Sequence, residues 1–160
     1  MRPKKLLLVC HANTSRSVMA EFLLRELLAE RGLAGALSIR SAGIAPYARD
    51  GALVSLDARL ALREIGIEVP EETVATDLKR NRHLYEEADF VVTMTEEQLA
   101  MLREAFPGPP EKAAHTLKEW AGESGDIEDP AGQDEDVFRA CRDEIRRCLL
   151  RALPRWLDGA

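Results

Sequence analysis

This sequence lacks the features that mark membrane, secreted and repeat proteins. No apolar run approaches the roughly 20 residues that a membrane-spanning helix needs. The apolar stretch at residues 6–9, behind the basic N-terminal residues, is too short for the core of a secretory signal. No internal repeat or low-complexity segment divides the chain. The 3 cysteines have no disulfide-framework spacing, so we expect a cytoplasmic protein with reduced thiols.

Positive charge is also in short supply, since 22 lysine and arginine residues stand against 28 aspartate and glutamate residues. The net charge of -6 argues against binding to nucleic acid, whose phosphates need a basic surface. Hydrophobic residues (46%) and charged residues (31%) occur in the proportions of a globular protein. We therefore expect one domain over residues 1–160 that binds neither nucleic acid nor membranes.

Apolar residues alternate between strand-like and helix-like spacing along the chain. The spacing predicts strands over residues 6–9, 37–41, 89–94 and 112–117, and helices over residues 17–32, 55–66, 95–106 and 135–157. Thr95 and Gln98 have the spacing of a capping box. Residues 107–110 are a predicted loop, and Pro154 is expected to kink or shorten the last helix. This alternation predicts an α/β fold with three layers, α/β/α, around a four-stranded parallel sheet.

Five residues separate Cys10 from Arg16 directly after the first predicted strand. Ligands of open parallel sheets bind at the carboxyl ends of the strands, where this loop lies. Backbone N–H groups, the positive end of the next helix and the Arg16 guanidinium would together hold a tetrahedral oxyanion. The loop therefore predicts a phosphatase that forms a cysteinyl-phosphate. The residues expected to bind phosphate or to support the loop are His11, Ala12, Asn13, Thr14, Ser15 and Ser17.

Such a reaction also needs an acid for the leaving group and a base for the water that releases phosphate, and one carboxyl group can serve as both. Asp129 is the best candidate, because Pro130 and Gly132 predict a loop that would bring it over the Cys10 loop. An Asp-Pro pair is also a common turn, and the acidic residues 126–136 could equally be the solvated start of the last helix. The residues alone leave this assignment open.

Short segments along the chain resemble the low-molecular-weight protein tyrosine phosphatase family, which includes bacterial protein arginine phosphatases and is related to arsenate reductases. The matching segments, in the order of the family, are residues 9–17, 19–21, 41–43, 88–89, 93–95 and 129–130. The resemblance implies that Cys10 is the nucleophile, Arg16 the phosphate clamp and Asp129 the general acid and base.

The resemblance further implies that Asn13 and Ser41 hold the strained backbone of the loop and that Ser17 supports the thiolate. It implies phosphorylated proteins or peptides as substrates and inorganic phosphate as product. We expect no metal ion and no other cofactor, since His83 and His115 lack a metal-ligand pattern.

The substrate residue stays open between phosphotyrosine and phosphoarginine. Thr14 stands where tyrosine phosphatases of the family usually carry an aliphatic residue, and the arginine phosphatases are similar to this chain in having threonine. After the Asp-Pro pair the family carries an aromatic or bulky wall residue, and this chain has Ala131. Tyr47 or Trp120 would have to supply an aromatic surface instead.

Two loop residues depart from the family pattern. Ser15 replaces a cysteine that can trap the oxidised nucleophile as a disulfide, so we expect Cys10 to over-oxidise more readily. His11 replaces a small or aliphatic residue, and it either lines the pocket mouth or is a solvated bystander.

Two other functions are alternatives: arsenate reduction by the same loop, and phosphate sensing without catalysis. Cys141 and Cys148 have the spacing of a redox pair found in some arsenate reductases, but they fall in the last predicted helix. Seven helical residues rise about 10.5 Å, which is too far for a disulfide, so we expect both to pack in the core. A sensing module would need neither Cys10 nor Asp129.

Overall fold

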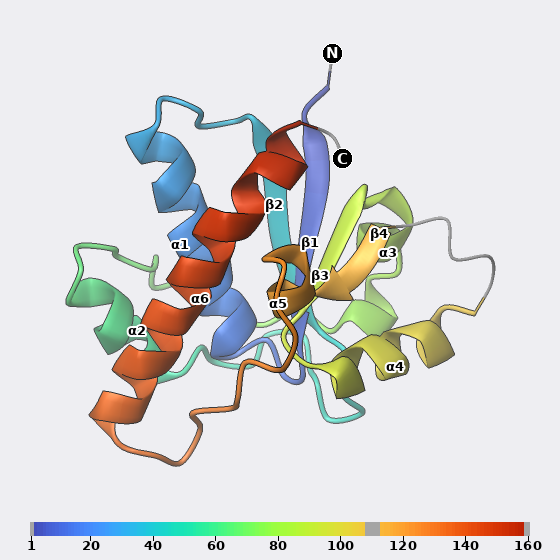
Figure 1. The fold of residues 1–160 in the computed structure, drawn as a ribbon. Coiled ribbons are helices and arrows are strands. Elements are labelled where there is room, and N and C mark those ends of the chain that lie inside the picture. The colour runs from blue at the N-terminus through green and yellow to red at the C-terminus, as the bar shows by residue number, and fades with distance from the viewer. Residues whose placement is uncertain (1, 108–112, 159–160) are drawn as a thin grey trace.

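A four-stranded parallel sheet forms the centre of the fold (Figure 1). The computed structural model describes residues 2–107 and 113–158. The strands lie in the order β2-β1-β3-β4, so β1 pairs with both β2 and β3. Their bounds are β1 (Lys4–Cys10), β2 (Leu37–Gly43), β3 (Phe90–Thr93) and β4 (Ala113–Thr116). The predicted α/β class and parallel sheet are confirmed.

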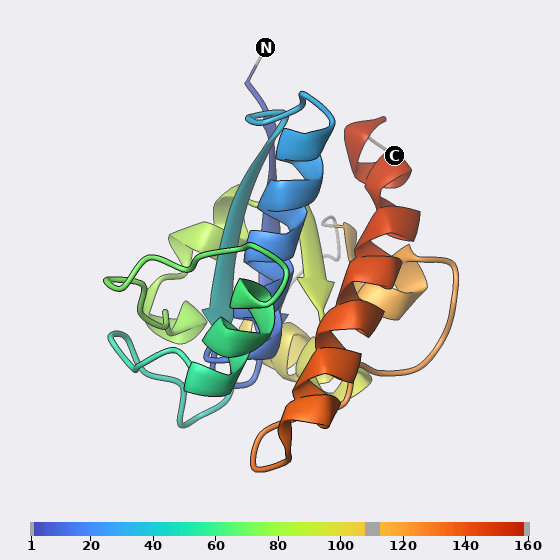
Figure 2. The same ribbon diagram turned by 90° about the vertical axis from the view of Figure 1, so that its left-hand side faces the viewer.

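β1 divides its side chains between two apolar cores, because successive residues of a strand point to opposite faces. Leu6 and Leu8 belong to the larger core, and Leu7 and Val9 belong to the smaller one. The helices over the larger core are α1 (Arg16–Glu30), α2 (Leu56–Arg63), α5 (Leu117–Trp120) and α6 (Glu135–Leu157). Those over the smaller core are the 3₁₀-helix η1 (Leu78–Arg80), α3 (His83–Glu87) and α4 (Glu96–Ala105). Figure 2 shows α1, α2 and α6 side by side on one face of the sheet. With η1, α3 and α4 over the smaller core on the other face, they give the predicted three layers.

Several predicted boundaries differ from the structure. β1 is longer than predicted and ends at Cys10, and α1 begins one residue early at Arg16. Leu117 begins α5 instead of ending a strand, because Thr116 caps that helix. α6 continues through Pro154 to Leu157, so the predicted early end is wrong. Residues 108–110 of the predicted loop and residue 112 of the last predicted strand lie outside the described residues.

Local signals explain where the long helices begin. The Thr95 and Gln98 capping box is present at the start of α4, as predicted. Asp134 accepts a hydrogen bond from the Val137 backbone N–H and so caps α6. η1, α3 and α5 are not predicted, since elements of three to five residues are too short to show a helical period.

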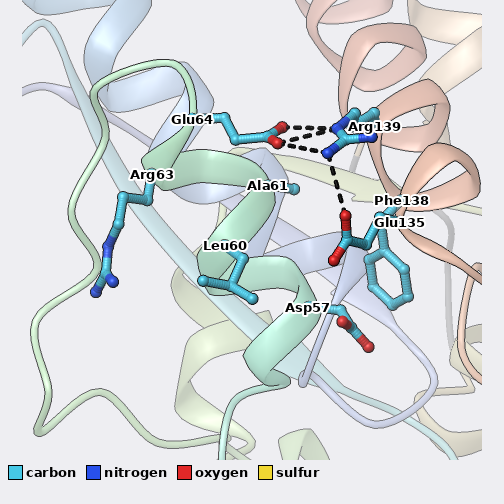
Figure 3. Close-up of a pocket in the computed structure, with 8 residues that line it drawn as sticks. All are labelled: Asp57, Leu60, Ala61, Arg63, Glu64, Glu135, Phe138 and Arg139. Carbon is cyan, nitrogen blue, oxygen red and sulfur yellow. Dashed lines mark hydrogen bonds and ion pairs between the residues drawn. The ribbon is translucent and has the colours of Figure 1, made fainter.

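A cavity of about 270 Å³ lies between α2 and α6 (Figure 3). Leu60 and Phe138 line it, and an ion pair between Glu64 and Arg139 crosses its rim. It contains none of the predicted site residues. Within residues 2–107 and 113–158, no helix is long and apolar enough to cross a bilayer. Cys10 lies at the other location that the fold offers for a ligand, the carboxyl ends of the strands.

Candidate active site

Cys10 ends β1, and its side chain is buried beside the start of α1. Its Sγ lies 2.9 Å from the Ser17 Oγ, and the Asn13 backbone N–H donates to it at 3.2 Å. The Ser17 Oγ already accepts from Asn13 Nδ2 at 2.8 Å, so its own hydrogen is free to point at the sulfur. Two donors directed at one sulfur suit a negatively charged acceptor.

Asn13 fixes the conformation of the loop. Its φ of 62° lies in the left-handed region, which asparagine tolerates better than most residues. The Thr76 backbone N–H donates to Asn13 Oδ1 at 2.8 Å and so orients the amide, because a backbone N–H can only donate. Nδ2 therefore faces Ser17 and also Ser41, to which it donates at 3.0 Å. Ser41 in turn donates to Glu21 at 2.5 Å, so the network ties the loop to β2 and α1.

Gly43, at the end of β2, allows the loop to lie directly against the sheet. A Cβ on Gly43 would come within 2.7 Å of the His11 carbonyl oxygen and 2.8 Å of the Ala12 carbonyl carbon. No other residue type fits there without a shift of the backbone. The next residue, Ile44, donates its N–H to the Cys10 carbonyl at 3.0 Å and secures this approach.

Free backbone donors follow the nucleophile. Within the described parts of the chain, the N–H groups of Ala12, Thr14, Ser15 and Arg16 donate to no protein acceptor. Ser15 precedes α1 but makes no side-chain capping bond, which leaves the first turn of the helix without a protein acceptor at that position. A row of free N–H groups at the start of a long helix is suited to an anion.

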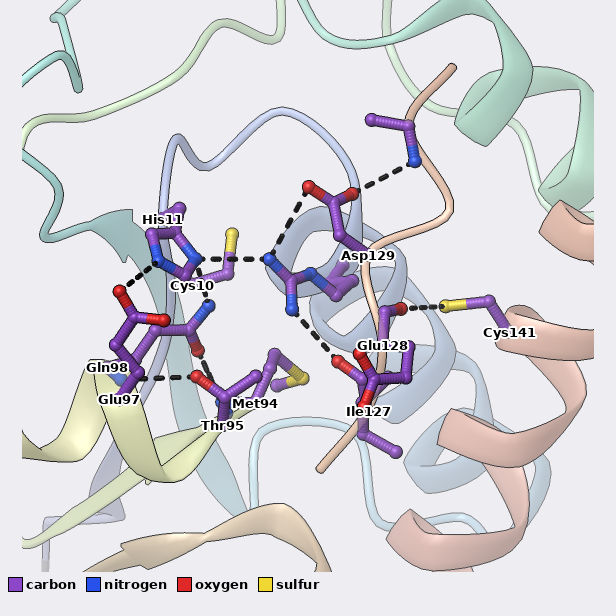
Figure 4. Close-up of polar contacts among 12 residues, drawn as sticks. Cys10, His11, Met94, Thr95, Glu97, Gln98, Ile127, Glu128, Asp129 and Cys141 are labelled. Atoms are coloured by element: carbon purple, nitrogen blue, oxygen red, sulfur yellow. Dashed lines mark hydrogen bonds and ion pairs between the residues drawn. The ribbon is translucent and has the colours of Figure 1, made fainter. Parts of the chain in front are cut away.

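Arg16 places its guanidinium at the same point, although the residue is only 4% exposed. Nη1 donates to the Ile127 carbonyl at 2.9 Å, and Nη2 lies 3.2 Å from His11 Nδ1 and 3.8 Å from Asp129 Oδ2. In Figure 4, dashed lines from His11, Ile127 and Asp129 meet at one unlabelled guanidinium, which these contacts identify as that of Arg16. A guanidinium has five N–H donors, so donors remain for a ligand.

Asp129 lies on the segment before α6, and its side chain is 54% exposed. Oδ1 accepts from the Ala131 backbone N–H at 3.0 Å, which is the usual bond of an Asx turn. Oδ2 faces Arg16. The carboxyl group thus lies between solvent and the guanidinium, and the structure brings together the three residues of the predicted reaction.

His11 is partly buried and belongs to this cluster, so the solvated-bystander alternative is wrong. Its Nδ1 lies 2.7 Å from Gln98 Nε2, and its ring is parallel to that of Tyr47 with the centroids 6.5 Å apart. Tyr47 is 67% exposed. Trp120 is buried and packs edge-on against Phe90, so its predicted role as an aromatic wall is wrong.

The other two cysteines lie on α6, where the Cys141 Sγ donates to the carbonyl oxygen of Glu128, next to Asp129, at 3.8 Å. Cys141 and Cys148 are free, buried and part of the larger core, as predicted. Burial raises the pKa of the Cys141 thiol to about 12. His83 and His115 are exposed. Among the described residues, no group of three or more histidine, cysteine, aspartate or glutamate side chains is placed to hold a metal ion.

Sequence reasoning missed three contributors to the site. The sequence predicts Gln98 only as part of a helix cap and assigns no role to the Ile127 carbonyl or to the Glu21 carboxylate. One signal was available: His11 and Gln98 follow two strands that are neighbours in the sheet. Polar residues after adjacent parallel strands meet at one edge.

Comparison with known proteins identifies relatives over nearly the whole length. The family model described as low molecular weight phosphotyrosine protein phosphatase matches residues 5–157. A protein-arginine-phosphatase of Geobacillus stearothermophilus is 37% identical over 150 residues, which are 93% of each chain. An arsenate reductase of Staphylococcus xylosus is 30% identical over 149 residues, which are 93% of this chain and 95% of the relative.

Solved structures agree with this relationship. An arginine phosphatase in which serine replaces the active-site cysteine and is phosphorylated superimposes with a TM-score of 0.84 at 32% identity. The match covers 96% of this chain and 95% of that one. This chain therefore belongs to the low molecular weight phosphotyrosine protein phosphatase family and is a protein phosphatase of that class.

Proposed function

We propose that this chain removes phosphate from protein side chains through a covalent intermediate on Cys10, with Arg16 and Asp129 as its partners. The observation that carries the proposal is the environment of the Cys10 sulfur. Two hydrogen-bond donors, Ser17 and the Asn13 N–H, are directed at it. It lies at the base of a loop with free N–H groups and a buried arginine. These are the requirements for a thiolate that attacks a bound phosphoryl group.

The first step transfers the phosphoryl group to sulfur. The S–P bond forms as the bond from phosphorus to the leaving oxygen or nitrogen breaks, and Asp129 gives its proton to the leaving atom. Arg16 and the free N–H groups of the loop hold the equatorial phosphoryl oxygens. The relative with a phosphorylated serine in place of its active-site cysteine supports a phosphoryl group at this position.

The second step releases the phosphate. The Asp129 carboxylate takes a proton from water, and the water oxygen attacks phosphorus while the S–P bond breaks. Inorganic phosphate leaves, and the thiolate and the protonated Asp129 are restored. No metal ion or other cofactor is needed for either step.

Phosphoarginine is the proposed substrate residue. Thr14 in the loop and the relatives named protein-arginine-phosphatase support it. Phosphotyrosine is the second candidate, because the exposed ring of Tyr47 lies beside His11 and could stack on an aromatic substrate.

The test measures phosphate release from two peptides of one sequence, which carry either phosphoarginine or phosphotyrosine. We expect faster turnover of the phosphoarginine peptide and no turnover by Cys10→Ser. Thr14→Ile should shift the preference toward phosphotyrosine. Turnover that survives in Cys10→Ser would refute the mechanism, and an unchanged preference in Thr14→Ile would remove Thr14 as the selector.

A further inference from the structure

The contacts of His11 determine which of its two ring nitrogens carries a hydrogen. Two groups meet at its Nδ1: Gln98 Nε2 at 2.7 Å and Arg16 Nη2 at 3.2 Å. The Arg16 nitrogen can only donate. The Gln98 amide can present either its oxygen or its nitrogen to His11, and the other contacts of this amide decide which.

The backbone at the end of β3 orients Gln98. The N–H groups of Met94 and Thr95 both donate to Gln98 Oε1, at 2.8 Å and 3.0 Å. Since backbone N–H groups only donate, Oε1 has to face them, and Nε2 is left facing His11 (Figure 4). Gln98 is fully buried, and its backbone N–H donates to the Thr95 hydroxyl at 3.1 Å in the capping box of α4, so this orientation is fixed by the fold.

Nδ1 of His11 is therefore an acceptor for two donors and carries no hydrogen. The imidazole is neutral, with its hydrogen on Nε2, which lies 3.8 Å from the Glu97 carboxylate. A hydrogen on Nδ1 would point at two other donors and would break both contacts.

We propose that neutral His11, oriented by Gln98, is a positioning residue that aims the Arg16 guanidinium at the phosphoryl group; this rests on the proposed function. The guanidinium has three neighbours that hold it: the Ile127 carbonyl, Asp129 and His11. Asp129 is exposed and is required to change its proton during the reaction, so it cannot be a constant restraint. His11 supplies an acceptor from the nucleophile loop itself.

The first test compares two substitutions that differ in one property. His11→Asn can place its amide oxygen near the position of Nδ1 and keeps an acceptor, whereas His11→Leu removes it. Inorganic phosphate, the product, serves as the ligand, and its inhibition constant is measured beside kcat and KM for the phosphopeptide. We expect His11→Leu to weaken phosphate binding and to lower kcat/KM, each by about tenfold. His11→Asn should stay within about threefold of the wild type.

Matched controls come from an exposed histidine on α3. His83→Leu and His83→Asn make the same chemical changes outside the site, and both should leave phosphate binding and turnover unchanged. Equal losses in His11→Leu and His11→Asn would overturn the proposal, because the acceptor would then be irrelevant. A wild-type protein that turns over neither phosphopeptide would instead refute the proposed function, so the two failures are distinguishable.

The second test addresses Gln98 without relying on fold stability. Gln98→Glu keeps an oxygen for the Met94 and Thr95 N–H groups but replaces the donor that faces His11 with an acceptor. We expect a loss of phosphate binding close to that of His11→Leu, and no more than about twofold further loss when both changes are combined. A full additive loss in the double variant would show that Gln98 acts independently of His11 and would overturn the arrangement.

An NMR measurement tests the proton position directly. In ¹⁵N-labelled wild-type protein at neutral pH, the His11 ring should show a protonated Nε2 and an unprotonated Nδ1. In Gln98→Glu, the hydrogen should move to Nδ1. A wild-type ring with its hydrogen on Nδ1 would contradict the proposal regardless of any activity.

Discussion

The nucleophile and the acid of this site are held in opposite ways. Cys10, Asn13 and Ser17 are buried and joined by hydrogen bonds of 2.8 to 3.2 Å that continue into the sheet. Asp129 is 54% exposed, receives one backbone hydrogen bond at 3.0 Å and lies 3.8 Å from Arg16. The phosphoryl group needs fixed donors, whereas the acid has to exchange protons with a leaving group and with water. The difference therefore follows from the two tasks.

The largest effect is expected from a substitution of the acid, Asp129. Asp129→Asn should lower kcat by about 10²- to 10⁴-fold, because the amide can neither give nor take the proton. The free energy of unfolding should change by no more than about 0.5 kcal/mol, since the side chain is exposed. Peptide turnover and urea unfolding measure the two effects separately.

Glu128→Gln is the matched control for this prediction. It removes the neighbouring exposed carboxylate, and we expect nearly normal turnover. An equal loss in both variants would mean that the charge of the segment, and not a proton on Asp129, supports the reaction.

At the buried nucleophile loop we expect the reverse of Asp129→Asn: a larger loss of stability and a smaller loss of turnover. Asn13→Ala removes the donor to Ser17 and Ser41 and leaves the Thr76 N–H without its acceptor, at a backbone φ that alanine disfavours. We expect a loss of about 2 to 3 kcal/mol in unfolding free energy, together with about tenfold slower turnover. If the variant were less stable but its folded form turned over substrate at the wild-type rate, Asn13 would contribute to stability alone, and the expected loss of turnover would be wrong.

The same contrast explains what could be predicted from the sequence. Cys10 and Arg16 lie on one continuous strand, loop and helix start, so their spacing alone predicts the phosphate loop. The position of Asp129 depends on how the segment before α6 passes the end of β3, where the Ile127 N–H donates to the Met94 carbonyl at 2.9 Å. No local sequence pattern records this contact, so the residues alone leave the role of Asp129 open. Trp120 was misassigned for the same reason, since only packing shows that its ring lies against Phe90.

A smaller effect is expected when Cys10 is oxidised. Ser15 adjoins Arg16 in the loop and cannot form a disulfide with Cys10. After prolonged peroxide exposure, we expect the wild type to regain only part of its activity with thiols, because Cys10 proceeds to the sulfinic acid. Ser15→Cys should recover more. Mass spectrometry of the Cys10 peptide reports the product, and full recovery of the wild type would contradict the prediction.

The last contrast is between the nucleophile and a cysteine of the core, and it appears only at alkaline pH. Burial raises the Cys141 pKa from 9.0 to about 12, so the folded chain retains the thiol proton after the unfolded chain has lost it. Because the folded state then binds more protons, stability from this group is complete below pH 9 and is lost as the pH rises toward 12. The free energy of unfolding should fall by up to about 1.4 kcal/mol per pH unit across this window.

Cys141→Ala should show a shallower slope, measured by urea unfolding at several pH values. Cys148→Ala is the control that keeps the Cys141 contribution, and a slope in Cys141→Ala equal to that of the wild type would show that the thiol is not held protonated by the fold.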